Sequence, residues 1–136
     1  MQDPIPATAA DGEVIEVRLP AEPTHLPVLR TFTADLATRL DFNLDEVADL
    51  RMAVDEACAG LVARAVKATQ LSCAFRLEPD ALLVVATART TDGTPPARDT
   101  FGWRVLTALV DKVDTEAEPD GLVTVKLYKR RAGTAS

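Results

Sequence analysis

Aromatic side chains, cysteine and histidine are all scarce in this 136-residue sequence. Aromatics make up 4% of the chain and hydrophobic residues 47%, so its core must consist largely of aliphatic side chains and alanine. A structural zinc site needs four closely spaced ligands, which two cysteines 15 residues apart and one histidine do not supply. Cys58 and Cys73 are therefore expected to be small core residues, with a redox role as the alternative.

Long apolar runs and excess positive charge are also missing. No run approaches the roughly 20 apolar residues that cross a bilayer, and the N-terminus lacks a signal-peptide pattern, so a cytoplasmic protein without membrane contact is expected. The net charge of −6 and the pI near 4.7 argue against direct binding to nucleic acid, which needs clustered Lys and Arg. An acidic surface suits a basic protein partner, although solubility alone is the alternative explanation.

The length fits one domain. Residues 1–12 are rich in Pro, Ala and Asp without periodicity and are expected to form a flexible N-terminal segment. Residues 13–129 carry the periodic patterns of a folded domain, and residues 130–136 are expected to form a flexible tail.

Hydrophobic periodicity predicts five strands and three helices. The predicted strands cover residues 13–19, 71–77, 81–89, 113–116 and 122–129, and the predicted helices cover residues 24–40, 43–68 and 101–111. Thr24 is the expected N-cap of the first helix, and Asn43 or Asp41 that of the second. Thr90–Asp99 is too polar and too rich in Gly and Pro to pack a core, so a loop is expected there.

The predicted element order is β-α-α-β-β-α-β-β. Hairpin-length links between the strands, with three helices left to share one face, indicate an α+β fold. We expect a two-layer α/β sandwich whose mixed, mostly antiparallel sheet is covered on one face by the three helices.

The second predicted helix carries the most informative pattern of the chain. Glu56 and Gly60 are four residues apart and lie on a face that differs from the buried stripe through Val47, Leu50 and Val54. Spacing alone also allows Glu56 to be an ordinary solvated glutamate.

Three segments together resemble a known family. Leu50–Ala57, Leu106–Val113 and Thr124–Leu127 are similar to segments of the anti-sigma-factor serine kinases of the GHKL superfamily, whose domain is the Bergerat or histidine-kinase-like ATPase fold. The resemblance covers the chain from about Glu13 to Lys129. It implies that Glu56 is the general base that takes a proton from a serine hydroxyl during ATP-dependent phosphoryl transfer.

The resemblance also implies a site for protein partners. Arg30 stands 26 residues before Glu56, where such proteins keep an arginine for gripping a sigma factor and an anti-anti-sigma protein. A homodimer is implied by the resemblance only, with the apolar flank of the first helix as the candidate interface.

The nucleotide motifs depart from the family pattern. Gly60 replaces the asparagine whose carbonyl oxygen holds Mg²⁺, so no metal ligand is expected there and binding of ATP and magnesium is doubtful. Asp92 and Gly93 are either a displaced remnant of the adenine-reading Asp-x-Gly-x-Gly motif or a plain turn. Gly102 is what remains of the glycine-rich phosphate segment, and Thr124, in the segment similar to the family's final strand, completes the candidate nucleotide-binding residues.

Three functions are compatible with this pattern. The first is an anti-sigma factor that sequesters an alternative sigma factor and is released by an anti-anti-sigma (STAS-type) partner, with weak or lost catalysis. The second is an active ATP-dependent serine kinase that phosphorylates the anti-anti-sigma factor. The third is a small scaffold module without these partners. The departures in the nucleotide motifs favour the first function, and the retention of Glu56 favours the second.

Overall fold

The structure is a computed structural model that describes residue 5 and residues 13–133. Its elements are the strands β1 (Glu13–Pro20), β2 (Gln70–Leu77), β3 (Ala81–Arg89), β4 (Lys112–Ala117) and β5 (Leu122–Arg130), the short 3₁₀ helix η1 (Pro23–His25), and the helices α1 (Leu26–Arg39), α2 (Leu44–Ala63) and α3 (Phe101–Leu109). The strands form one five-stranded sheet in the order β1-β2-β3-β5-β4. The expected order of strands and helices is confirmed.

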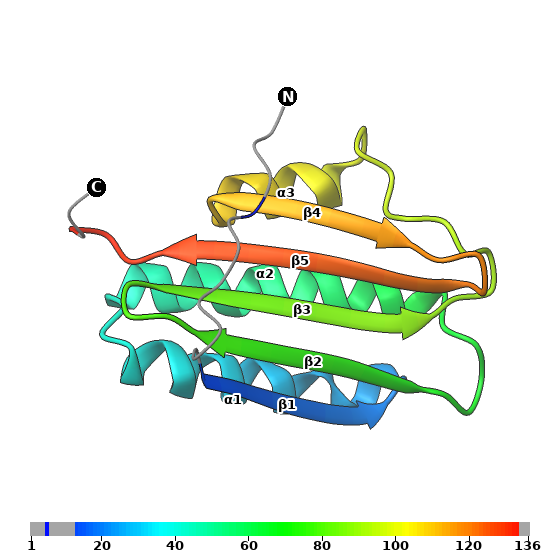
Figure 1. The fold of residues 1–136 in the computed structure, drawn as a ribbon, viewed down its shortest axis with the longest axis horizontal. Coiled ribbons are helices and arrows are strands. Elements are labelled where there is room, and N and C mark those ends of the chain that lie inside the picture. The colour runs from blue at the N-terminus through cyan, green and yellow to red at the C-terminus, as the bar shows by residue number, and fades with distance from the viewer. Residues whose placement is uncertain (1–4, 6–12, 134–136) are drawn as a thin grey trace.

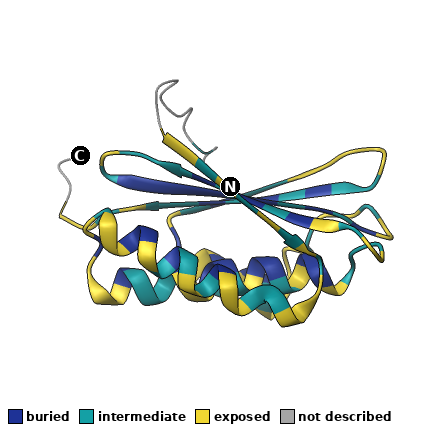
Figure 2. Cartoon of the chain, turned by 90° about the horizontal axis from the view of Figure 1, so that it is seen from below, coloured by how far each residue is buried: buried dark blue, intermediate teal, exposed yellow. Residues whose placement is uncertain are grey.

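The helices form a second layer on one face of the sheet (Figures 1 and 2). In Figure 1, α2 runs behind β3 and β5, with α1 on one side of it and α3 on the other. All four strand pairings are antiparallel, so the sheet is more uniform than the mixed sheet that the sequence suggested. The α+β two-layer sandwich is confirmed.

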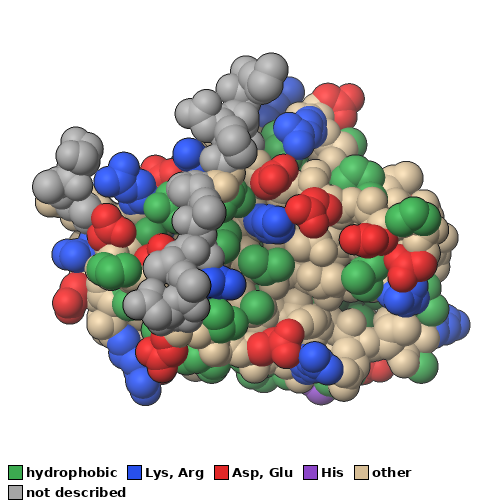
Figure 3. All heavy atoms as spheres, viewed as in Figure 1, with side chains coloured by type: hydrophobic (Ala, Val, Ile, Leu, Met, Phe, Trp, Pro, Cys, Tyr) green, Lys and Arg blue, Asp and Glu red, His purple; other side chains and the backbone are tan. Residues whose placement is uncertain are grey.

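Alternation along the strands determines which side chains meet the helices. In β5, Val123, Val125 and Leu127 are buried against the helical layer, while Thr124 and Lys126 lie between them on the opposite face. That opposite face carries interleaved acidic and basic side chains (Figure 3). The pairs Arg18–Glu16 at 3.1 Å and Lys126–Glu116 at 2.8 Å belong to it.

Helix α2 begins at a complete capping box. The Asn43 side chain accepts a hydrogen bond from the Glu46 backbone N–H at 2.8 Å, and the Glu46 carboxylate accepts one from the Asn43 N–H at 2.8 Å. Of the two expected caps, Asn43 and Asp41, the cap is therefore Asn43. Glu46 is buried, and its second carboxylate oxygen accepts a hydrogen bond from the backbone N–H of Ala132, so the cap also ties down the C-terminal segment.

Replacing Asn43 by alanine should remove this cap. The Glu46 N–H at the first turn of α2 then loses its acceptor, and the free energy of unfolding should fall by about 1 kcal/mol. Urea denaturation measures the change, and Thr38→Ala in α1, whose hydroxyl only bonds back to the Ala34 carbonyl, is the matched control with a smaller expected loss. Equal losses in the two variants would contradict the assignment of Asn43 as the cap.

Three helix boundaries differ from expectation, one of them in α3, which ends at Leu109 instead of Asp111. Thr24 is not an N-cap, because it lies within η1 and His25 already has helical backbone angles, so α1 starts at Leu26. Helix α2 ends at Ala63 instead of Ala68. It stops because the chain turns to meet the end of β3: Ala65 forms a bridge with Thr90, and the Val66 N–H donates to the Arg89 carbonyl at 2.8 Å.

The C-terminal boundary also extends further than expected. Arg130 belongs to β5, and the backbone N–H groups of Arg131 and Ala132 donate to the Asp80 carbonyl and the Glu46 carboxylate. The folded part of the chain therefore continues past Lys129. Apart from Ile5, the N-terminal segment 1–12 lies outside the described residues, as do residues 134–136.

Both cysteines are buried free thiols in the core between α2 and β2, as expected. The neighbouring Cys58 thiol and burial raise the pKa of the Cys73 thiol well above its ordinary value, so Cys73 stays protonated at neutral pH. Among the described helices, none is both long and apolar enough to span a bilayer.

Candidate functional site

Glu56 lies against the first turn of α3. Its side chain projects from α2, and a Cβ built at Gly102 would lie 2.8 Å from the Glu56 Oε2 atom. Gly102 therefore leaves room for this carboxylate. Helix α3 starts at the N-cap Thr100, whose hydroxyl accepts a hydrogen bond from the Trp103 N–H at 3.2 Å. The positive end of the α3 dipole favours a negative group at this place, and here that group is the chain's own glutamate.

The two aromatic residues on either side of Gly102, Phe101 and Trp103, differ in their environment. Trp103 is buried and anchors α3 in the core, with the Arg98 guanidinium stacked on its ring at 4.8 Å. Phe101 is 78% exposed and adds an apolar side chain to the surface at the start of α3.

Gly60 lies one turn beyond Glu56 on α2, and nothing approaches a Cβ built there within 4 Å. A groove beside it is lined by Arg64 and by Thr94, Pro95, Pro96 and Ala97 of the loop before α3. Gly60 brings no side-chain oxygen to this groove. Within residues 13–133 and Ile5, no three His, Cys, Asp or Glu side chains gather in a way that suits a metal ion.

The open space at Gly60 leads to a stability prediction. Replacing Gly60 by alanine should stabilise the protein by about 0.5–1 kcal/mol, because alanine loses less backbone entropy in a helix and meets no neighbour. Thermal unfolding measures the change. The control Gly121→Ala should destabilise, since Gly121 has φ +93° and its Cβ would lie 3.0 Å from the Thr90 carbonyl oxygen. Destabilisation by Gly60→Ala would contradict the open space described here.

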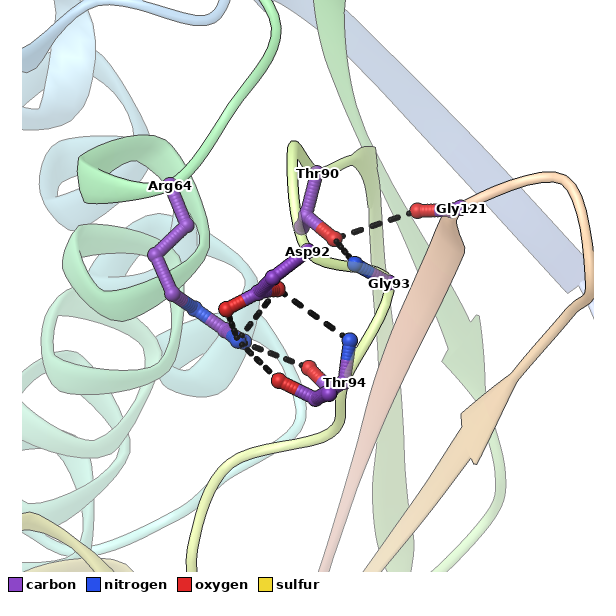
Figure 4. Close-up of polar contacts among 6 residues, drawn as sticks. All are labelled: Arg64, Thr90, Asp92, Gly93, Thr94 and Gly121. Atoms are coloured by element: carbon purple, nitrogen blue, oxygen red, sulfur yellow. Dashed lines mark hydrogen bonds and ion pairs between the residues drawn. The ribbon is translucent and has the colours of Figure 1, made fainter.

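Asp92 and Gly93 form a turn that is joined to the end of α2 (Figure 4). The Arg64 guanidinium donates to both carboxylate oxygens of Asp92, at 3.0 and 3.2 Å. Gly93 has φ +63°, and its N–H donates to the Thr90 hydroxyl at 2.9 Å. The hydrogen bond from the Thr94 N–H and the Arg64 guanidinium hold the pKa of the Asp92 carboxyl below its ordinary value. Asp92 thus stays ionised and is already paired within the chain.

The structure brings some of the candidate residues together and separates others. Gly102 of α3 lies against Glu56 of α2, and Gly60 lies one turn further along α2. The turn at Asp92 and Gly93 is joined by Arg64 to the groove beside Gly60. Thr124 lies on the other face of the sheet, where its hydroxyl is 3.1 Å from that of Thr87. The geometry therefore separates Thr124 from Glu56.

Arg30 lies where α1 meets α2. Its Nε atom is 3.7 Å from the Asp55 Oδ1 atom, and the two side chains are 44% and 36% exposed. Arg30 is thus held by the residue next to Glu56 while much of its guanidinium still faces solvent.

Arg64 is a site residue that sequence reasoning missed. Its acceptors are 28 and 30 residues further along the chain, so no local pattern indicates the pairing. The spacing of Arg64 four residues after Gly60, on the same helical face, is the only available signal.

The described residues do not fit magnesium and ATP. Gly60, which the resemblance assigns to the metal-ligand position, has no side-chain oxygen. The first turn of α3 faces the Glu56 carboxylate, and the candidate adenine reader Asp92 is paired with Arg64. A negative carboxylate beside the α3 N-terminus disfavours the approach of phosphate groups to it.

The fold and the helix-borne glutamate define a domain of the histidine-kinase type. Residues 19–128 match the family described as the histidine kinase-like ATPase domain. The anti-sigma-F factor RsbW of Mycobacterium tuberculosis is 34% identical over 127 residues, which cover 89% of this chain and 76% of that protein. The serine-protein kinase RsbW of Bacillus subtilis is 32% identical over 78 residues, which cover 55% of this chain and 49% of that protein.

A solved structure shares the fold. The RsbU and RsbW domains of a Mycobacterium tuberculosis protein match with a TM-score of 0.72 and 16% identity, over 90% of this chain and 34% of that one. The chain belongs to the RsbW family of histidine kinase-like ATPase domains.

Proposed function

We propose that this chain is an anti-sigma factor that sequesters an alternative sigma factor in the cytoplasm and is released by a STAS-type anti-anti-sigma protein. A relative that matches 89% of the chain is named an anti-sigma-F factor, which supports the first half of this proposal. The acidic surface, with a net charge of −6, favours encounter with basic segments of a partner.

The proposal rests on one contrast: Arg30, which the resemblance assigns to partner binding, is open to solvent, whereas the residues that the resemblance assigns to nucleotide binding are incomplete. Arg30 is more than a third exposed beside Asp55, and Gly60 brings no side-chain oxygen one turn beyond Glu56. A protein that only binds partners needs an accessible Arg30 and does not need a metal ligand at position 60. Phosphoryl transfer depends on neutralising charge at a metal, so the glycine favours binding over catalysis.

The second candidate function is an ATP-dependent serine kinase that acts on the anti-anti-sigma protein. Relatives named serine-protein kinase RsbW and the exposed Glu56 carboxylate favour it. Glu56 has no hydrogen bond or ion pair with another residue in the described part of the chain, so it is available to accept a proton from a serine hydroxyl.

A capture experiment tests the proposal. The tagged chain is used as bait in a bacterial lysate, bound proteins are identified by mass spectrometry, and the affinity for each is measured by calorimetry with and without Mg-ATP. We expect a sigma factor and a STAS-type protein, with affinities that do not change when Mg-ATP is added. Transfer of labelled phosphate to the STAS-type protein, lost in Glu56→Ala, would favour the kinase instead.

We also propose that the chain forms a homodimer through the outer flank of α1. A shallow groove there is lined by Pro27, Val28, Thr31, Phe32 and Asp35, and Val28 is 50% exposed. Light scattering should give the mass of two chains for the wild type and of one chain for Val28→Asp. A monomeric wild type would contradict this interface.

A further inference from the structure

A single arginine joins the loop before α3 to the end of α2. The Nη1 atom of Arg64 donates to both carboxylate oxygens of Asp92, at 3.0 and 3.2 Å, and also to the Thr94 carbonyl at 2.7 Å and hydroxyl at 3.0 Å (Figure 4). The Arg64 side chain is 27% exposed. One guanidinium thus contacts two residues of the loop, Asp92 and Thr94, while it is partly shielded from solvent.

The backbone reinforces the same junction. The Thr91 N–H donates to the Arg64 carbonyl at 2.9 Å, and the Thr94 N–H donates to the Asp92 carboxylate at 3.1 Å. The Thr90 hydroxyl accepts from the Gly93 N–H at 2.9 Å and donates to the Gly121 carbonyl at 3.2 Å (Figure 4). The loop is therefore fixed to α2 on one side and to the turn between β4 and β5 on the other.

The turn at Gly93 is closely packed. A Cβ at Gly93 would lie 3.3 Å from the Gly121 Cα atom, and the positive φ of Gly93 is itself unfavourable for other residues. The following Pro95 and Pro96 have fixed φ angles, which reduces the number of conformations that the loop can adopt. Together these features position the loop beside Gly60, where it lines one wall of the groove.

We propose that Arg64 acts as a latch that keeps loop 91–100 in place over the groove beside Gly60 without a bound nucleotide. The anionic group that Arg64 binds is the Asp92 carboxylate of the loop itself. A nucleotide entering the groove has to compete with Asp92 for the Arg64 guanidinium that lines it. This inference goes beyond the proposed function, because it concerns the isolated chain and needs no partner.

Hydrogen exchange of the full-length chain, measured by NMR with and without Mg-ATP, tests the latch. In the wild type we expect the Gly93 and Thr94 amides to be protected to the same degree in both conditions. In Arg64→Met these two amides should exchange about fivefold faster or more, while amides of β3 and β5 stay unchanged. Asp92→Asn keeps the acceptor for the Thr94 N–H but removes the charge, so it should accelerate exchange to a smaller extent.

The matched control is Arg39→Met. Arg39 also pairs with an aspartate on the surface, Asp35 at 3.1 Å, but does not touch the loop. In Arg39→Met, the Gly93 and Thr94 amides should exchange as in the wild type. Unchanged exchange in Arg64→Met, or wild-type loop amides that become protected only when Mg-ATP is added, would overturn the latch. Neither result bears on whether the chain binds a sigma factor.

Discussion

Replacing Phe75 by alanine should reduce the free energy of unfolding by about 3–5 kcal/mol, the largest loss that we expect from a single side chain. Phe75 is fully buried in the middle of β2, and its ring lies 5.0 Å from that of Phe32 at an interplanar angle of 53°. Truncation removes buried apolar surface, leaves a cavity, and breaks the contact between β2 and α1.

The loss is large because domains of this size are stable by only about 5–15 kcal/mol. Thermal unfolding should show a midpoint lowered by roughly 10–20 °C, and urea unfolding should show a lower midpoint with the same slope. Phe101→Ala is the matched control, because Phe101 is 78% exposed and its truncation should change stability by less than about 0.5 kcal/mol. A loss below about 1.5 kcal/mol for Phe75→Ala would contradict the tight packing of this core.

Phe75 illustrates which features of the fold are predictable from the sequence. Its strand alternates between buried and partly exposed residues, as β5 does, and this period determines which side chains face the helices. The capping box at Asn43 and Glu46 is equally local, since both partners lie within four residues. Patterns of this kind were sufficient for the element order and the layer arrangement.

Features that depend on distant parts of the chain were not predictable. Helix α2 ends at Ala63 although its apolar pattern continues, because Ala65 and Val66 pair with the end of β3 some 24 residues later. The Arg64–Asp92 pair is of the same kind, since its partners belong to different elements that only the folded sheet brings together. Local propensity gives no information about such contacts.

In the candidate site, too, some features were predictable from the sequence and others depended on the folded structure. The resemblance identified Glu56 and Gly60, but the position of the Glu56 carboxylate over Gly102 depends on how α3 packs beside α2. Thr124 was grouped with the nucleotide residues on the basis of resemblance, whereas the alternation of β5 puts it on the opposite face of the sheet. The period-2 pattern that was already visible in the sequence would have separated it from Glu56.

Charge reversal at Arg30 should weaken binding of both the sigma factor and the STAS-type protein by about 2 kcal/mol or more, which is roughly 30-fold in each dissociation constant. Arg30 is held by Asp55 at 3.7 Å and remains 44% exposed, so its guanidinium is oriented and still able to meet a partner's acidic group. In Arg30→Glu a carboxylate replaces it beside Asp55, and the surface then repels the same acidic group.

Arg39→Glu is the matched control for this variant. Arg39 lies on the same helix, pairs with Asp35 at 3.1 Å and is 72% exposed, and its reversal changes the net charge by the same two units, from −6 to −8. Any effect of total charge on association is therefore equal in the two variants, so a difference between them reports on the local contact. Calorimetry with each partner measures both, and circular dichroism verifies that the fold is retained. Unchanged affinity of Arg30→Glu for both partners, or equal weakening by Arg39→Glu, would exclude Arg30 as the shared contact.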